Sequence, residues 1–516
     1  MTGTEKTTLK NRSLSRWISH GVTAMIFLVI GLALARTDVG EQIKQSGKQM
    51  AFKAAATAAR RADLGDARIN LLLENPEVMK RIASGGAFGG AFSRQVAQNM
   101  FGRNHEAAIE DAKRLTRIEE VADRTWLVRM PIVNAVVFGT DEGLVVVDTG
   151  MAPAGPALLE AIRSVSDAPI HTIIYTHGHV DHAYGTWALV EDGSKPQIIA
   201  HENLPLRFDR YIRLRGSIAQ YMSQPLDQLP SSKDDLVWPT RTFRDRLELD
   251  IGGETFVLQH RKGETDDHLY VWLPGRRVLA SADFYQGFLP NAGNGKRVQR
   301  YVEEWARTMV EMAALEPAVV MPAHGEPLTD SALIQENFLV LAEALDYIVD
   351  HTIAGLNQGL RKDQVFQSLQ LPEHLANHPS LAVQYVSPQD ISKMVIRNYT
   401  GWWDDLPSDW SPAAQEDQAA MIVELAGGID PLIERARGML EVRDFGDGLH
   451  TAEVNLKLAS HLAEWAWLSH PENPGAQQLV LDAFKARILD PESNTQEMLA
   501  YLDRMIETRQ RQLDAE

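Results

Sequence analysis

The feature that most constrains the fold of this chain is a dense polar cluster directly after an apolar run. Residues His171–Tyr175 are typical of a short buried strand, and positions 176–182 then read Thr-His-Gly-His-Val-Asp-His. Because a loop can send alternate side chains in different directions, His177, His179, Asp181 and His182 can face two neighbouring metal ions. Three histidines and one aspartate in the order His-x-His-x-Asp-His favour a metal site over an unrelated polar loop.

Composition restricts the kind of metal site and the kind of ligand. None of the 516 residues is cysteine, which excludes disulfides and thiolate zinc sites, so His and carboxylate side chains must hold any metal. The formal net charge of -18, with no stripe of Lys and Arg, argues against nucleic-acid binding. An anionic small molecule is still compatible with this balance, because a metal and a few local cations can dominate a pocket.

The N-terminus has the pattern of an export segment. Four basic residues precede the uncharged stretch from Trp17 to Ala35, and Ala33-Leu34-Ala35 has the small-x-small form of a signal-peptidase site; the basic residues are Lys6, Lys10, Arg12 and Arg16. The length is also close to what a membrane-anchoring helix needs. Residues 1–35 are therefore predicted to be a signal peptide, slightly favoured, or a membrane anchor through residues 17–35. The chain is expected to be periplasmic, secreted or membrane-attached.

The remaining chain divides into three regions by its hydrophobic pattern. Residues 36–122 are predicted to be helical, interrupted by a loop at Gly85–Gly90, with no readable function. Residues 123–330 carry the short apolar runs and turns of a mixed α/β domain, with a mostly helical insertion from Leu204 to Trp238 as a lid or substrate wall. Residues 331–516 show only helical spacing, which predicts a separate all-helical domain.

Short apolar or alternating segments mark the expected strands of the α/β domain. A helix is expected at Pro156–Val165, between the third of these strands and the histidine cluster. The strand segments are Thr125–Met130, Asn134–Phe138, Leu144–Asp148, His171–Tyr175, Pro196–Ala200, Leu247–Leu258 (with a turn at Gly252-Gly253) and Tyr270–Leu273.

The polar cluster and three later segments resemble the motifs of the metallo-β-lactamase superfamily, in the same order. The later segments are Gly263-Glu264-Thr265-Asp266-Asp267-His268, Ala282-Asp283 and Met321-Pro322-Ala323-His324-Gly325. The resemblance implies an α/β fold, the metallo-β-lactamase αββα sandwich. It also implies two Zn²⁺ ions per chain. One would take His177, His179 and Glu264, and the other Asp181, His182 and His324. Asp283 would bridge them, about 3.5–4 Å apart, around a bridging hydroxide.

A glutamate at the position of the usual third histidine resembles the zinc-type alkylsulfatases. The C-terminal half has landmarks similar to that family's helical dimerisation domain, so the resemblance implies a homodimer; these are Tyr399-Thr400-Gly401-Trp402-Trp403, Pro407, Gly427-Gly428 and Asn473-Pro474. A counterpart of the family's sterol-carrier-like third domain is not expected. The usual His-Asn pair after the bridging acid is Pro290-Asn291 here, which removes a residue that would assist the leaving group.

The predicted reaction is hydrolysis of an anionic, amphiphilic alkyl sulfate ester to the alcohol and inorganic sulfate. Besides its place as a ligand, Asp181 is predicted to be catalytic, and His268 is taken as the general acid, with His201 and His260 as the other titratable candidates. Five side chains are predicted to bind the substrate, the cations among them through the anionic head group: Tyr184, Asn291, Lys296, Arg297 and Arg300.

Two other functions are compatible with the same residues. A lactone, carboxylic ester or phosphoester hydrolase could use the same metal core, although the glutamate and the helical half favour the sulfatase. A membrane-associated assembly protein with a structural or vestigial metal centre is the non-enzymatic alternative. Seven ligand candidates count against it, because structural zinc sites are usually closed sets of four ligands. β-Lactam hydrolysis would leave the helical half unexplained.

Overall fold

The computed structural model of the chain describes residues 100, 105–191, 193, 195–222, 226–383, 386–441, 452–487 and 506. None of the helices in these ranges has the length and hydropathy needed to cross a membrane. The predicted export segment at residues 1–35 and most of the helical region predicted at 36–122 lie outside the described residues, so both stay predictions.

The first sheet contains seven strands that lie side by side in chain order. Strands β1 to β4 pair antiparallel and β4 to β7 pair parallel. Val136 pairs with Val147 and Val147 pairs with Ile174, so apolar side chains form continuous rows across the centre of the sheet. The strands are β1 (Arg117–Ala122), β2 (Thr125–Arg129), β3 (Asn134–Thr140), β4 (Gly143–Val147), β5 (Ile170–Ile174), β6 (Gln197–His201) and β7 (Arg241–Phe243).

The second sheet contains five strands in the order β12-β11-β10-β9-β8. Its strands pair antiparallel except for β11 and β12, which are parallel and end beside each other. The strands are β8 (Arg246–Ile251), β9 (Glu254–His260), β10 (Leu269–Leu273), β11 (Val278–Ala282) and β12 (Val319–Pro322).

The two sheets face each other across a core of side chains from both, among them Phe138, Val147, Phe256 and Val271. Phe138 and Phe256 meet edge to face with their ring centroids 5.6 Å apart, which links the sheets directly. Strands β3, β4, β10 and β11 are buried along their whole length, because helices cover the outer face of each sheet.

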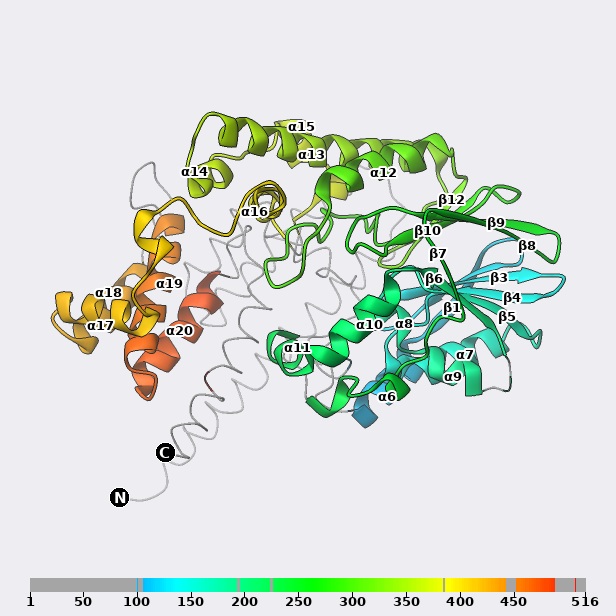
Figure 1. Cartoon of the computed structure of the whole chain (residues 1–516), viewed down its shortest axis with the longest axis horizontal. Coiled ribbons are helices and arrows are strands. Elements are labelled where there is room, and N and C mark those ends of the chain that lie inside the picture. The colour runs from blue at the N-terminus through cyan, green and yellow to red at the C-terminus, as the bar shows by residue number, and fades with distance from the viewer. Residues whose placement is uncertain are drawn as a thin grey trace, which may run out of the picture. The chain divides into compact units, whose positions relative to one another are not determined.

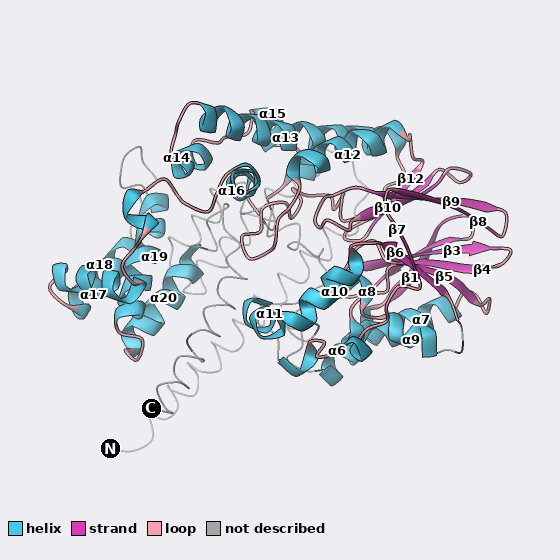
Figure 2. Cartoon of the chain, in the orientation of Figure 1, coloured by secondary structure: helices cyan, strands magenta, loops and turns pink. Residues whose placement is uncertain are grey.

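Helices complete the four layers, as Figures 1 and 2 show. One apolar cluster joins the outer face of the first sheet to α6 (His105–Leu115), α7 (Gly155–Arg163), α9 (Thr186–Glu191), α10 (Leu204–Arg213) and α11 (Arg215–Met222). Another joins the outer face of the second sheet to α12 (Val302–Ala314), α13 (Ser331–Asn357) and α16 (Pro388–Tyr399). Helices on both sides of residue 330 therefore pack in the same apolar cluster. The domain boundary that the sequence predicts near this residue stays a prediction.

The described part of the C-terminal half is helical. Asp330 caps α13, since its side chain accepts from the amides of Ala332 and Leu333, and a separate apolar cluster joins four later helices. These are α17 (Gln415–Leu425), α18 (Ile429–Leu440), α19 (Ala452–Ser469) and α20 (Pro474–Ala486). The short elements are α8 (Val180–Ala183), α14 (Lys362–Gln367), α15 (Glu373–Ala376), η2 (Ala152–Ala154), η3 (Leu226–Gln228), η4 (Lys233–Asp235), η5 (Pro379–Leu381) and η6 (Pro407–Trp410).

The predicted fold class, an αββα sandwich followed by helices, is confirmed. The structure differs from the sequence prediction at residues 117–122, which form strand β1 and not a continuation of the helical region. This strand lies at the edge of the first sheet and is largely exposed, so its Arg and Glu side chains hide the alternation of a strand.

Candidate metal centre

The polar cluster occupies the end of the first sheet where β4 and β5 finish together. Because Val147 pairs with Ile174 in parallel register, Asp148 and the histidine loop leave the sheet side by side. The backbone amide and hydroxyl of Thr176 both donate to the Asp148 carboxylate, at 2.8 and 2.7 Å. The amide of Thr149 donates to the carbonyl of His182 at 2.6 Å and closes the loop onto the sheet.

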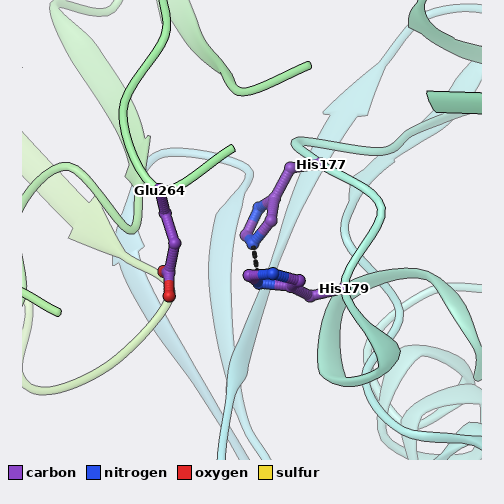
Figure 3. Close-up of side chains that lie close together, drawn as sticks. All are labelled: His177, His179 and Glu264. Atoms are coloured by element: carbon purple, nitrogen blue, oxygen red, sulfur yellow. Dashed lines mark hydrogen bonds between the residues drawn. The ribbon is translucent and has the colours of Figure 1, made fainter. Parts of the chain in front are cut away.

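The seven side chains that the sequence analysis assigned to a metal pair converge at this end of the sandwich. The structure forms the groups His177–His179–Glu264, Asp181–His182–His324 and His177–His182–Asp283, and within each group the ligand atoms lie within 4.8 Å of one another. Figure 3 shows Glu264 approaching the two histidines from a separate segment of the chain. The two predicted sets of three therefore meet at one place, with the Asp283 side chain close to both.

The donor atoms of this cluster fit a divalent cation. His182, Glu264 and Asp283 are almost completely buried, yet His182 Nε2, Glu264 Oε2 and Asp283 Oδ1 have no hydrogen-bond partner among the described residues. Buried polar atoms without partners are rare unless something else satisfies them. A set of imidazole nitrogens and carboxylate oxygens without sulfur is compatible with zinc and with several other divalent ions.

Burial and neighbouring charges shift the pKa values of the cluster. Desolvation lowers the pKa of His324, but the carboxylates of Asp283 and Asp181 outweigh it and raise the value to about 9. Desolvation raises the pKa of Glu264 to about 8, an effect that the Arg300 guanidinium opposes and Asp283 reinforces. Both groups hold their protons more tightly than usual, so protons compete with a cation for the same atoms.

Hydrogen bonds fix which nitrogen of two histidines faces the cluster. His182 Nδ1 lies 2.8 Å from Asp148 Oδ2, and His324 Nδ1 lies 2.6 Å from the carbonyl oxygen of Ile132. With the proton on Nδ1 in each ring, Nε2 is left with its lone pair toward the other ligands. Asn134 supports the second arrangement, because its side-chain amide donates to the carbonyls on both sides of His324, those of Pro322 and Gly325.

The residue between the first two histidines must be glycine. The amide of Gly178 donates to Asp267 Oδ2 at 2.8 Å, and a Cβ added at this position would lie 2.8 Å from the Arg207 Cβ. Arg207 in turn pairs with Asp266 at 2.6 Å and lies 3.5 Å from Asp267. The insertion helix α10 therefore reaches the histidine loop through Arg207.

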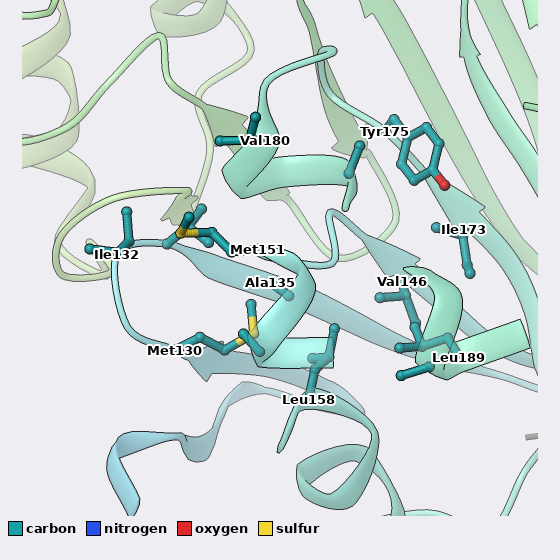
Figure 4. Close-up of a cluster of buried hydrophobic side chains, with 14 of the residues drawn as sticks. Met130, Ile132, Ala135, Val146, Met151, Leu158, Ile173, Tyr175, Val180 and Leu189 are labelled. Atoms are coloured by element: carbon teal, nitrogen blue, oxygen red, sulfur yellow. The ribbon is translucent and has the colours of Figure 1, made fainter. Parts of the chain in front are cut away.

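The middle of the loop is anchored in the apolar core. Val180 stands between His179 and Asp181 and is 5 % exposed, packed in the cluster that also contains Met151 and Ile132 (Figure 4). Burying this side chain turns its two neighbours, His179 and Asp181, toward the less buried side, where both are partly exposed. His179 and Asp181 are therefore the two of the seven ligand candidates that are partly exposed.

Glu264 is held by an ion pair and a hydrogen bond from two residues that the sequence predicts to bind the substrate. Arg300 Nη2 lies 2.9 Å from Glu264 Oε1, and Asn291 Nδ2 donates to the same oxygen at 2.8 Å. A second nitrogen of Arg300 donates to the carbonyl of Glu264. Arg300 is 1 % exposed, so it lies inside the protein and not on the surface of an open cavity.

The other substrate-binding candidates are half-buried. Lys296 and Arg297 lie in the loop between β11 and α12, where the amide of Lys296 donates to Asn294 Oδ1 at 3.0 Å. The ring of Tyr184 packs edge to face on Phe208 and Tyr211 of α10. The structure therefore leaves these three partly exposed, and their role in binding stays a prediction.

The surroundings of His268 favour a structural role over the predicted role as general acid. Its ring is completely buried and stacks on Phe284 at 3.9 Å, and the amides of Glu264 and Asp283 point at its two nitrogens. Desolvation lowers its pKa to about 3, so the imidazole is neutral near neutral pH. His201 and His260 stack on each other at 3.7 Å, and desolvation lowers the pKa of both.

Sequence reasoning missed four residues that orient the ligands: Asp148, Asn134, Arg207 and Asp267. One signal was available for Asp148, because it ends the apolar strand segment that comes before the strand leading into the histidine cluster. Asp267 belongs to the same sequence motif as Glu264, but nothing in that motif shows which residue is a metal ligand and which one only supports the loop.

Three residues around the site have left-handed backbone conformations although none is glycine. These are Ile132 with φ 78°, Asp148 with φ 61° and Ala282 with φ 49°. The carbonyl of Ile132 accepts from His324, the carboxylate of Asp148 accepts from His182, and Ala282 directly precedes Asp283. The strained positions therefore coincide with residues that place ligands.

Two protein families match different parts of the chain. Residues 129–324 match the metallo-beta-lactamase superfamily, and residues 361–510 match the alkyl sulfatase dimerisation family. The matched ranges correspond to the sandwich with its polar cluster and to the helical half.

Curated relatives and one solved structure agree with this division. A linear primary-alkylsulfatase of a Pseudomonas species is 30% identical over 57% of this chain and 61% of its own length. An alkyl/aryl-sulfatase of Saccharomyces cerevisiae is 25% identical over 76% of this chain and 64% of its own length. The chain thus spans about three-fifths of these relatives. The structure of a stereoselective inverting sec-alkylsulfatase from a Pseudomonas species superposes with a TM-score of 0.64 at 18% identity, covering 78% of this chain and 67% of that one, which shows a shared fold.

Proposed function

Because the chain joins a metallo-beta-lactamase domain to an alkyl sulfatase dimerisation domain, we propose that it is a metal-dependent hydrolase of alkyl sulfate esters. The observation that carries this proposal is the convergence of four histidines and three carboxylates at one end of the sandwich, with Glu264 in the place of a third histidine. The same combination of a glutamate ligand and a helical half is what the sequence resemblance to alkylsulfatases rests on.

In the proposed centre, His177, His179 and Glu264 would hold one zinc ion, and Asp181, His182 and His324 the other, with Asp283 between them. A pair of divalent cations supplies Lewis acidity and makes water nucleophilic near neutral pH. The protein's part is to place the one proton of each neutral ring on Nδ1 and so to direct Nε2 toward the cation, through Asp148 for His182 and the Ile132 carbonyl for His324.

The sulfate group of the substrate would enter beside the half-buried residues His179 and Asp181. Lys296 and Arg297 are half-buried cations in the loop that also carries Asn291, which favours them for an anionic head group. The buried walls formed by His268, Phe284 and Trp305 keep water away from the opposite side of the ligands.

A second substrate class follows from Pro290, which stands where alkylsulfatases usually have a histidine. Without that proton donor, the rate depends more strongly on how basic the leaving group is. Aryl sulfates and activated carboxylic or phosphoric esters have less basic leaving groups than a primary alkyl sulfate. The same metal core would then hydrolyse these esters faster.

The decisive experiment measures products from purified, metal-loaded protein given dodecyl sulfate, an aryl sulfate, a long-chain lactone and an alkyl phosphate. The wild type is expected to release inorganic sulfate from dodecyl sulfate, and His179→Ala is expected to release none. The control is His171→Ala, which changes a partly exposed histidine paired with Glu142 and should leave the rate unchanged. Opening of the lactone without release of sulfate would refute the sulfatase. Zinc-loaded protein that turns over none of the four would favour a non-enzymatic role. Reaction in ¹⁸O-labelled water shows whether the S–O or the C–O bond breaks.

We also propose that the chain forms a homodimer through its helical half and is exported or anchored by its N-terminal segment. The match of residues 361–510 to a dimerisation family supports the first statement, and the basic residues before Trp17 support the second. Sedimentation equilibrium tests the dimer, since a monomer at micromolar concentration would contradict it. Fractionation of cells expressing the full chain tests export.

A further inference from the structure

Glu264 brings a negative charge to a position that would more commonly hold a neutral imidazole. The centre already contains the carboxylates of Asp181 and Asp283, so the glutamate adds a third in a buried space. An uncompensated buried charge is costly, and it also repels its neighbours of the same sign.

Arg300 supplies the matching positive charge. Its side chain is 0% exposed and that of Glu264 is 4% exposed, with Nη2 2.9 Å from Oε1. A second nitrogen of the guanidinium donates to the carbonyl of the same glutamate. The arginine therefore contacts both the side chain and the backbone of one residue, through two different nitrogens of one planar group.

Asn291 completes the arrangement around the same carboxylate. Its side-chain amide donates to Oε1 at 2.8 Å, the same oxygen that Arg300 Nη2 approaches in the ion pair. The other oxygen, Oε2, is buried and has no hydrogen-bond partner among the described residues. The hydrogen bond and the ion pair on Oε1 restrain the carboxylate, which lies within ligand distance of His177 and His179, and leave Oε2 available for a cation.

We propose that Arg300 and Asn291 are positioning residues that hold Glu264 as a ligand through Oε2, and that Arg300 is the charge partner of this glutamate. This inference rests on the metal centre of the proposed function. It departs from the sequence prediction that both residues bind the substrate head group. The requirement for Arg300 then exists only while residue 264 is a carboxylate.

A double-mutant cycle tests this dependence. Full-length protein is depleted of metal, and its affinity for Zn²⁺ is measured by competition with a chromophoric chelator for the wild type, Arg300→Met, Glu264→His and Glu264→His/Arg300→Met. Arg300→Met is expected to weaken the site on the order of 10- to 100-fold, because the glutamate loses its support. In the Glu264→His background the same change is expected to strengthen binding at least about tenfold, because an unpaired cation is removed from beside the metal.

Further variants separate positioning from general stability. Asn291→Ala should weaken the same site without changing charge, and Arg300→Lys should recover part of the loss. The visible spectrum of Co²⁺-substituted protein should change in Arg300→Met, because coordination by Glu264 changes. Arg276→Met is the matched control, since Arg276 is also largely buried and pairs with Glu254 at 2.9 Å. It should lower the melting temperature and leave the Zn²⁺ affinity and the Co²⁺ spectrum unaltered.

The outcomes separate this inference from the proposed function. Equal losses from Arg300→Met in both backgrounds, or a double variant that binds Zn²⁺ no better than Glu264→His, would overturn it. If Arg300→Met does not fold, the comparison of Glu264→His with the double variant still decides, because the latter contains neither charge. The cycle uses no substrate. If Arg300→Met weakens Zn²⁺ binding in the wild type and strengthens it in the Glu264→His background, but the protein releases no sulfate, only the sulfatase proposal is refuted. If the protein releases sulfate and Arg300→Met weakens Zn²⁺ binding equally in both backgrounds, only this inference is refuted.

Discussion

Replacing Asp148 by asparagine is expected to weaken the binding of a divalent cation at His182, although Asp148 is not among the ligand candidates. Asp148 Oδ1 accepts from the Thr176 amide at 2.8 Å, while Oδ2 accepts from the Thr176 hydroxyl at 2.7 Å and faces His182 Nδ1 at 2.8 Å. Both carboxylate oxygens are therefore acceptors. An asparagine of the same shape has one oxygen and one NH₂ group.

The backbone amide of Thr176 can only donate, so the asparagine oxygen would stay on that side and the NH₂ group would face His182. His182 would then carry its proton on Nε2, which is the nitrogen that faces Asp283 at 3.5 Å. The opposite orientation of the amide loses the bond from Thr176. We expect the Zn²⁺ affinity of this site to fall about 10- to 100-fold, or about 1.4–2.8 kcal/mol.

The assay is a chelator competition on metal-depleted protein, with zinc content per chain measured by mass spectrometry. Asp330→Asn is the matched control, because the Asp330 side chain uses only Oδ1 to accept from the amides of Ala332 and Leu333. An asparagine oxygen can replace it there. An Asp148→Asn protein that folds and binds its full zinc complement with wild-type affinity would refute the reasoning.

Three further predictions concern the supports of the ligands. Gly178→Ala should lower both the zinc content and the melting temperature, since the new Cβ would lie 2.8 Å from the Arg207 Cβ, and normal values for both would contradict the packing argument. Asn134→Ala should reduce the free energy of unfolding by about 1–3 kcal/mol, measured in urea, because two backbone carbonyls beside His324 lose their donor; an unchanged value would show that water replaces it. In metal-depleted protein the pKa of His324 is raised from 6.5 to about 9 and that of Glu264 from 4.5 to about 8, so both groups keep their protons in the folded chain at pH values where they lose them in the unfolded chain. Between about pH 7 and 9 the buried histidines with lowered pKa values, such as His268, are neutral in both states, so the folded chain binds more protons than the unfolded chain there. The free energy of unfolding should therefore decrease as pH rises through this range, and an increase would contradict the assignment.

The layers of the fold could be predicted because most strands are buried runs with clear turns between them. Residues 144–147 and 269–273 lie in strands whose every side chain is buried, and such runs are visible in the sequence. Strand β1 could not be predicted from its own residues, because it is an exposed edge strand rich in Arg and Glu. Its conformation depends on pairing with β2, which no local pattern reveals.

The candidate ligands could be found in the sequence because four of the seven are close together in one loop. The residues that orient these ligands could not be found in the sequence, because each of their contacts joins distant parts of the chain. Asp148 meets His182 across 34 positions, and Asp267 meets Gly178 across 89. Arg300 is predicted to bind the substrate because a basic residue in a loop is usually exposed. Its burial against Glu264, 36 positions away, results from the assembly of the second sheet, which brings the loops after β9 and β11 together.

The left-handed backbone at Ile132, Asp148 and Ala282 has a consequence for how an ion would be captured. Each such residue raises the energy of the folded chain by about 1–3 kcal/mol, so the surrounding layers must enforce these conformations whether or not a ligand is present. The two packed sheets thus fix the positions of the candidate ligands before an ion binds. An arriving ion would find its partners already in place, and little of its binding energy would be consumed in ordering loops.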